Sequence, residues 1–176
     1  MAVIDKTGKQ ICTFNASGFR PFSGGYALVE VNEEVRLLST DGKMSEPLRM
    51  ISNVRSASIR KGYIIYREGG YAGLIDKDGN EIISPSEYGS LKFIDDNLLE
   101  ATLPSGNWNK AEYGVIDYSG KEVMSFERGK LTPLGDDRYI INETPSTSYL
   151  INSKREHLSE QFADNGEYNV GTIVRR

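Results

Sequence analysis

Few residues of this sequence could take part directly in catalysis. The chain of 176 residues has one histidine, His157, and one cysteine, Cys12. Nucleophilic catalysis needs a base held within hydrogen-bonding distance of a nucleophile, and only elimination would pair these two residues. A phosphate-binding loop of the form GxxxxGK is absent from the sequence. We therefore predict that the protein is not an enzyme and uses no cofactor.

Acidic residues occur in two patterns that could bind a metal ion. The segment DKDGNE, residues 76–81, has glycine at its fourth position, whereas a calcium-binding EF-hand loop has it at the sixth. The same turn recurs without paired acids as DKTG and DYSG. Acid pairs at 33–34, 95–96 and 136–137 lie where solvated turn residues are ordinary. A single cysteine excludes an internal disulfide and a cysteine-based zinc site, so we predict no metal site.

The candidate binding residue is Trp108, the only tryptophan, with Asn107 and Asn109 beside it. It lies in LPSGNWNKAEY, residues 103–113, inside the longest interval of the repeat described next. Insertions in repeats map to loops that often bind, and tryptophan is a favoured anchor among adaptable Asn, Ser and Gly residues. The alternative, that Trp108 folds back onto the core and holds the loop in place, stays open.

An internal repeat must supply the elements that position these residues. A short turn occurs five times, 34 to 41 residues apart. Its members are VIDKTGKQI with Asp5 and Gly8, LLSTDGKM with Ser39 and Gly42, LIDKDGNEI with Asp76 and Gly79, VIDYSGKEV with Asp117 and Gly120, and LINSKREHL with Asn152 and Arg155. The first residue can accept a backbone hydrogen bond, and glycine at the fourth is typical of a type I turn followed by a residue with positive φ. Arg155 breaks this pattern, which predicts a strained, longer or less regular fifth turn.

The segments around the turns have the composition of strands. β-branched and aromatic residues are concentrated at 26–31, 63–68, 97–103 and 138–144, which favours extended structure. Weaker segments at 88–94 and 130–134 predict further strands. Residues 156–162 have apolar residues at 158 and 162, a spacing that predicts two turns of helix.

A unit of this size cannot bury its own apolar face and must stack on its neighbours. We therefore predict an all-β fold in one domain, residues 1–176, built from five tandem antiparallel hairpin or meander units. The predicted units are approximately 1–33, 34–69, 70–110, 111–147 and 148–176. A propeller-like ring and an open β superhelix both satisfy the pattern.

The repeat resembles a known family. YAGLIDKDGNEIISPSEY, residues 71–88, followed by FIDDNLLEAT, is similar to the bacterial WG-repeat family, whose units carry a Trp-Gly pair, an aspartate turn, a glycine and a tyrosine. The likeness covers the chain as five degenerate units. The signature tryptophan is replaced by Ala72 before Gly73 and by Tyr113 before Gly114. The resemblance implies a binding or structural module and no general activity.

Charge and hydropathy restrict the partners. The net charge is −4 and the basic residues are scattered, which argues against binding to a nucleic-acid backbone. No apolar run approaches the 18 residues of a membrane span, and the first residues lack the pattern of a signal peptide. We expect no membrane insertion and a cytoplasmic location, while a secreted or surface origin stays open.

The predicted function is protein–protein interaction or scaffolding, without enzymatic activity. The alternative is a carbohydrate or cell-wall binding module, in which exposed tyrosines among the 10 in the chain would stack on sugar rings. Many of these tyrosines recur at equivalent points of the units, which favours packing between repeats over ligand binding.

Overall fold

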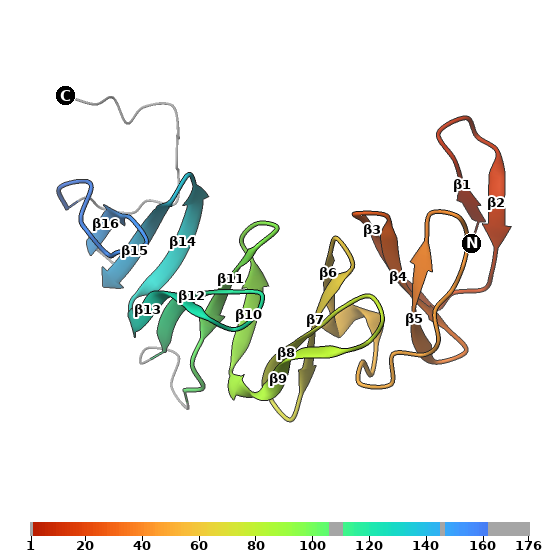
Figure 1. Cartoon of the computed structure of the whole chain (residues 1–176), viewed down its shortest axis with the longest axis horizontal. Coiled ribbons are helices and arrows are strands. Elements are labelled where there is room, and N and C mark those ends of the chain that lie inside the picture. Colours follow the sequence, from red (N-terminus) through yellow and green to blue (C-terminus); the bar gives the residue numbers. More distant parts are fainter. Residues whose placement is uncertain (1, 106–110, 145–146, 162–176) are drawn as a thin grey trace. The chain divides into compact units, whose positions relative to one another are not determined.

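The computed structural model describes residues 2–105, 111–144 and 147–161 (Figure 1). These described residues form sixteen strands and one short 3-10 helix, η1 (Val54–Ser56). The chain is therefore all-β, as the strand signals in the sequence predict.

The strands form five small antiparallel sheets, and within each sheet the strands lie side by side in chain order. The first sheets are β1 (Ala2–Ile4) with β2 (Gln10–Thr13), then β3 (Gly18–Ser23), β4 (Tyr26–Val31) and β5 (Glu34–Ser39). Two four-stranded sheets follow, β6 (Ser58–Arg60), β7 (Tyr63–Glu68), β8 (Tyr71–Ile75) and β9 (Glu81–Tyr88), then β10 (Ser90–Phe93), β11 (Leu98–Thr102), β12 (Glu112–Asp117) and β13 (Glu122–Arg128). The last is β14 (Lys130–Gly135), β15 (Arg138–Thr144) and β16 (Thr147–Ile151).

The chain divides into two compact units, Met1–Leu91 and Lys92–Arg176. In the first unit, one core joins β4 and β5 to β7 and β8, through residues such as Leu28, Leu37, Ile64 and Ile75. In the second unit, one core joins β12 and β13 to β14, β15 and β16. Adjacent sheets within each unit therefore share their apolar residues, as expected of repeats that cannot bury a core alone.

Each repeated turn connects the last two strands of a sheet, or ends its last strand. The glycines of the first four turns have φ between 83° and 86°, at Gly8, Gly42, Gly79 and Gly120. In the fourth turn, Oδ1 of Asp117 accepts hydrogen bonds from the amides of Ser119 and Lys121, at 2.8 and 3.0 Å. Asp5 and Asp76 accept the same pair of amide bonds in their turns. The turn has the positive φ and the side-chain acceptor that its residues predict.

The fifth turn corrects one prediction. The amide of Arg155 donates to the carbonyl of Asn152 at 2.9 Å, and Oδ1 of Asn152 accepts from the amides of Lys154 and Glu156. This turn therefore has the same length and hydrogen bonds as the others, and the expectation of a longer or less regular turn is wrong. Arg155 keeps φ at 59°, where a residue with a Cβ atom is strained by about 1 kcal/mol.

The short helix expected over residues 156–162 is wrong for its described part. His157 instead forms a single antiparallel bridge with Ile151, and the amide of Leu158 donates to the carbonyl of Leu150 at 2.7 Å. The turn before it returns the chain alongside β16. Backbone pairing with that strand therefore outweighs the weak helical spacing of two apolar residues.

The turn aspartates make stability depend on pH. Hydrogen bonds from the hydroxyls of Thr7 and Ser119 lower the pKa of Asp5 and Asp117, respectively. A lowered pKa in the folded state stabilises it above the unfolded pKa of about 3.9, and this stabilisation is lost as pH falls through the folded pKa. In the double variant Asp5→Asn/Asp117→Asn the amides do not titrate. We expect its free energy of unfolding in urea to fall less than that of the wild type between about pH 5 and pH 2.5. Equal slopes would contradict the assignment.

Candidate functional site

One apolar position of the repeat is exposed in only one of its five copies. It is the residue before the first residue of the turn, and it ends a strand in every sheet. Its five members, with their exposed fractions, are Ile4 (61%), Leu38 (1%), Ile75 (0%), Ile116 (0%) and Ile151 (1%). The last four end strands that have a strand or bridge partner on both sides. In the described part of the chain, β1 pairs with β2 alone, so one side of Ile4 lacks the neighbour that buries its equivalents.

An apolar groove of about 400 Å³ lies beside β1, and we call it the β1 groove. It is lined by Ala2, Val3, Ile4, Phe14, Phe19, Arg20, Pro21, Phe22, Ala27, Val29 and Leu38. The last three belong to the core of the first unit, where Val3 and Phe14 pack against them. Arg20 is the one charged residue of the lining, and its guanidinium donates to the carbonyls of Val54 and Arg55 at 3.3 and 2.6 Å. The groove therefore offers an apolar surface with little polar chemistry.

Strand β3 supplies two phenylalanines to this groove. A regular strand directs residues 19 and 22 to opposite faces, but the pairing of β3 with β4 shifts register between Arg20 and Ser23. Phe19 and Phe22 both line the groove, with exposed fractions of 54% and 41%. The sequence analysis did not identify this site. The signal available there was FRPF, with two phenylalanines around a proline, the residue that is confined to edge strands and bulges.

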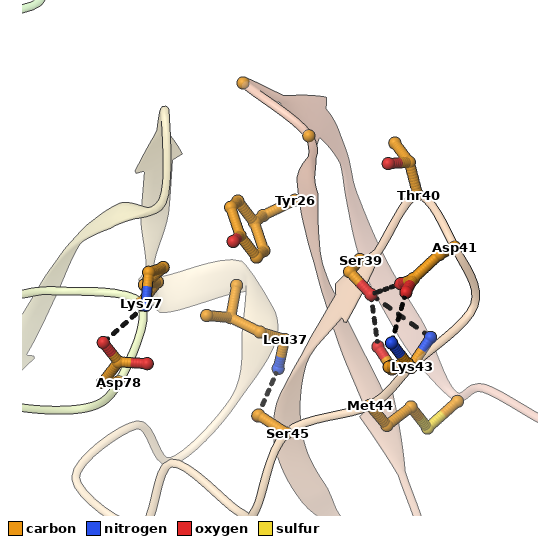
Figure 2. A pocket seen from close by; sticks show the side chains of 12 residues that line it. Tyr26, Leu37, Ser39, Thr40, Asp41, Lys43, Met44, Ser45, Lys77 and Asp78 are labelled. Carbon is orange, nitrogen blue, oxygen red and sulfur yellow. Dashed lines mark hydrogen bonds and ion pairs between the residues drawn. The ribbon is translucent and has the colours of Figure 1, made fainter.

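A second groove, of about 580 Å³, lies near Tyr26 in the first unit (Figure 2). Its charged side chains are paired with one another, Lys43 with Asp41 at 2.8 Å and Lys77 with Asp78 at 2.5 Å. The hydrogen bond from Lys43, followed by that from Ser39, lowers the pKa of Asp41 to about 2. Because these ions already neutralise each other, the groove has no charged group waiting for a ligand.

The tyrosines of the repeat are largely packed. Tyr26 packs against the core of the first unit, and Tyr113, Tyr139 and Tyr149 belong to or pack against that of the second. None of the tyrosines among the described residues falls in the exposed class. Their recurrence therefore reflects packing, which leaves few aromatic faces for the carbohydrate alternative.

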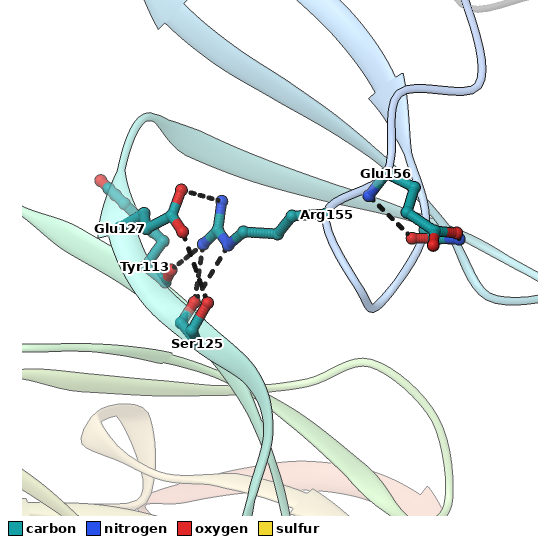
Figure 3. Close-up of polar contacts among 6 residues, drawn as sticks. Tyr113, Ser125, Glu127, Arg155 and Glu156 are labelled. Atoms are coloured by element: carbon teal, nitrogen blue, oxygen red, sulfur yellow. Dashed lines mark hydrogen bonds and ion pairs between the residues drawn. The ribbon is translucent and has the colours of Figure 1, made fainter.

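The second unit contains a polar cluster around Arg155 (Figure 3). Nη2 of Arg155 donates to the carbonyls of Tyr113 and Ser125 at 2.8 and 2.7 Å, and Nε donates to the same Ser125 carbonyl at 3.2 Å. Nη1 lies 3.5 Å from a carboxylate oxygen of Glu127. Burial lowers the pKa of the guanidinium, and the charge of Glu127 opposes this effect. The side chain thus attaches the fifth turn to β12 and β13, which is a structural role.

The other residues singled out in the sequence are not gathered into a site. Trp108, Asn107 and Asn109 lie outside the described residues, so their role stays a prediction. His157 stacks on Tyr149 with ring centroids 4.3 Å apart, and Cys12 is partly buried in β2. Over residues 2–105, 111–144 and 147–161, no cluster of three or more His, Cys, Asp or Glu could hold a metal ion. No helix within the same ranges is long and apolar enough to cross a membrane.

Comparison with solved structures found distant likenesses. Hsv2 of Kluyveromyces marxianus is 12% identical, with a TM-score of 0.47, over 81% of this chain and 47% of that one. Hsv2p of Kluyveromyces lactis is 7% identical, with a TM-score of 0.45, over 78% and 46%. Apo AztD of Citrobacter koseri is 17% identical, with a TM-score of 0.44, over 88% and 52%. This chain spans about half the length of the structures it matches.

Comparison by sequence bears on the repeat itself. The curated proteins yielded no match. The family model of the WG containing repeat matches residues 2–34 and 73–101, which include the Asp5–Gly8 and Asp76–Gly79 turns. The chain is therefore a member of the WG containing repeat family, as its turn spacing and the segment at 71–88 predict.

Proposed function

We propose that this chain is a non-enzymatic repeat module that binds another protein through the β1 groove. The observation that carries the proposal is the exposure of Ile4, Phe19 and Phe22 around one groove. Clustered apolar surface on a water-soluble face is a common feature of sites that bind proteins. Burying a large apolar side chain contributes about 1.5–3 kcal/mol, so two or three such residues can dominate a moderate affinity.

The lining of the β1 groove favours a protein over a saccharide. A sugar needs polar groups that bind its hydroxyls, and the charged group here, Arg20, already donates to two carbonyls. The groove near Tyr26 offers the alternative, because it combines an aromatic ring with hydroxyl and charged groups. Those groups are paired with one another, so a sugar would have to displace existing contacts.

The test compares capture of proteins from a lysate of the source organism by three forms of the chain. The wild type and Val123→Ser are expected to capture the same specific protein, and Phe19→Ser/Phe22→Ser is expected to lose at least about tenfold of it. Val123 is the matched control, an exposed apolar residue on β13. Equal thermal unfolding of the three forms is required first. Equal capture by all three would remove the β1 groove from the binding surface.

The saccharide alternative is tested with the same proteins. Intrinsic fluorescence is titrated with a panel of soluble cell-wall saccharides, and we expect no change. A saturable change in the wild type that disappears in Tyr26→Ala would favour the carbohydrate module instead.

A further inference from the structure

We propose that the bound protein adds an extended strand to the free edge of β1, antiparallel to it, with its apolar side chains in the β1 groove. This inference rests on the protein-binding function proposed above and specifies the chemistry of the partner. It is argued from the sheets of this chain, which contain the same arrangement in completed form.

The first argument is the equivalence of β1–β2 with the last two strands of both four-stranded sheets. The turn Asp5–Gly8 joins β1 to β2, as Asp76–Gly79 joins β8 to β9 and Asp117–Gly120 joins β12 to β13. In those two sheets, β7 and β11 cover the other edge of the equivalent strand. No strand among the described residues covers that edge of β1 (Figure 1).

The second argument is that the missing neighbour leaves a measurable trace. Ile75 and Ile116 are fully buried, with Ile64 of β7 and Leu99 of β11 directly opposite. Ile4 holds the same position and is 61% exposed, with the β1 groove beside it. An unpaired strand edge presents free backbone donors and acceptors, which an extended peptide can satisfy.

The chain itself indicates the side chains that such a strand must carry. Opposite the equivalents of Ile4 stand Ala27, Ile64, Leu99 and Tyr139. The next residues along the same strands are Leu28, Ile65, Glu100 and Ile140, and then Val29, Tyr66, Ala101 and Ile141. Eleven of these twelve residues are apolar or aromatic. The partner is therefore an extended segment with three successive residues of that type.

A second copy of this chain is the less suitable source of that strand. The strands with the required composition are β4, β7, β11 and β15, and each is the middle strand of a trio, paired on both sides. The described part of a second copy therefore has no free strand of this composition to donate without breaking a sheet. We assign the edge to a segment of a different polypeptide.

The probe for the test is a fluorescein-labelled peptide with the sequence of residues 61–69, KGYIIYREG. Fluorescence anisotropy with the full chain is expected to show saturable binding. Replacing the second isoleucine of the peptide by proline removes an amide donor, and this change is expected to weaken binding at least about tenfold. Ile4→Lys in the chain is expected to weaken binding as much, whereas the control Val123→Lys leaves it unchanged. Hydrogen exchange is expected to slow at the amides of residues 2–4 when the peptide binds.

The outcomes separate this inference from the proposed function. If Phe19→Ser/Phe22→Ser loses the captured protein while Ile4→Lys and the proline peptide have no effect, the groove binds a protein without strand addition, and the inference is overturned alone. If neither the peptide nor a lysate protein depends on the groove, both proposals fail. If light scattering shows a dimer that Ile4→Lys dissociates, a second copy occupies the edge, which overturns the assignment to a different polypeptide.

Discussion

Replacing Gly73 by alanine is expected to destabilise the protein by about 2–3 kcal/mol. A Cβ atom at Gly73 would lie 2.7 Å from Cε1 of Tyr66 and 2.8 Å from the carbonyl oxygen of Ile83. Neither neighbour can move easily. Tyr66 is buried and donates a hydrogen bond from its hydroxyl to Glu81 at 3.1 Å, and Ile83 lies in the β9 ladder opposite Leu74. Burial, with the hydrogen bond to Glu81, raises the pKa of Tyr66 to about 12, so the ring stays neutral and in place at neutral pH.

The matched control for this change is Gly8→Ala. Gly8 has open space around its Cα atom but a φ of 86°, so alanine there is strained by about 1 kcal/mol without any clash. Urea denaturation of the wild type and both variants measures the two costs separately. A Gly73→Ala variant that loses no more than Gly8→Ala would show that Tyr66 or the β9 backbone yields, and the close approach would then not explain the glycine.

The same constraint recurs in the next sheet and explains part of the repeat. A Cβ atom at Gly114 would lie 2.9 Å from the carbonyl oxygen of Met124 and 3.0 Å from the ring of Phe126. In both sheets the glycine lets an aromatic ring lie against the backbone of the neighbouring strand. The sequence marks this glycine through the family resemblance, but its physical reason requires the strand pairing.

The turns and strands could be predicted because their signals are local. Asp, a polar pair and Gly within four residues specify the backbone of a turn, and β-branched runs specify the strands on either side. The exposure of Ile4 could not be predicted in this way. VIDKTG and LIDKDG are nearly the same string, and the difference between Ile4 and Ile75 lies in whether a strand elsewhere in the chain pairs with the edge beside it.

The candidate site was missed for the same reason. Phe19 and Phe22 look like residues of opposite faces until the register shift of β3 is known, and the groove forms only when β3 and β1 meet the core residues of β4 and β5. Trp108 was the better candidate by composition alone. Composition selects residues that bind well when exposed, whereas the pairing of strands decides which residues are exposed.

Arg155 provides the second prediction of large effect. Arg155→Ala is expected to lose about 2–4 kcal/mol, because it removes the donors to two carbonyls and the ion pair with Glu127 while keeping a Cβ atom at positive φ. The side chain is only 11% exposed, so water replaces these contacts poorly. Lys154→Ala, one residue earlier in the same turn and exposed, is the control and should change stability by less than about 0.5 kcal/mol.

Arg155→Gly separates the two properties of this position. It loses the same side-chain contacts as Arg155→Ala but relieves the strain of a φ of 59°, so it should be more stable than the alanine variant by about 1 kcal/mol. Both should remain less stable than the wild type in urea denaturation. If Arg155→Gly equals or exceeds the wild type, the polar cluster contributes nothing beyond the strain it offsets. If both variants fall well below it, the contacts of the guanidinium with Tyr113, Ser125 and Glu127 outweigh the strain, which explains why the fifth turn keeps the geometry of the others without its glycine.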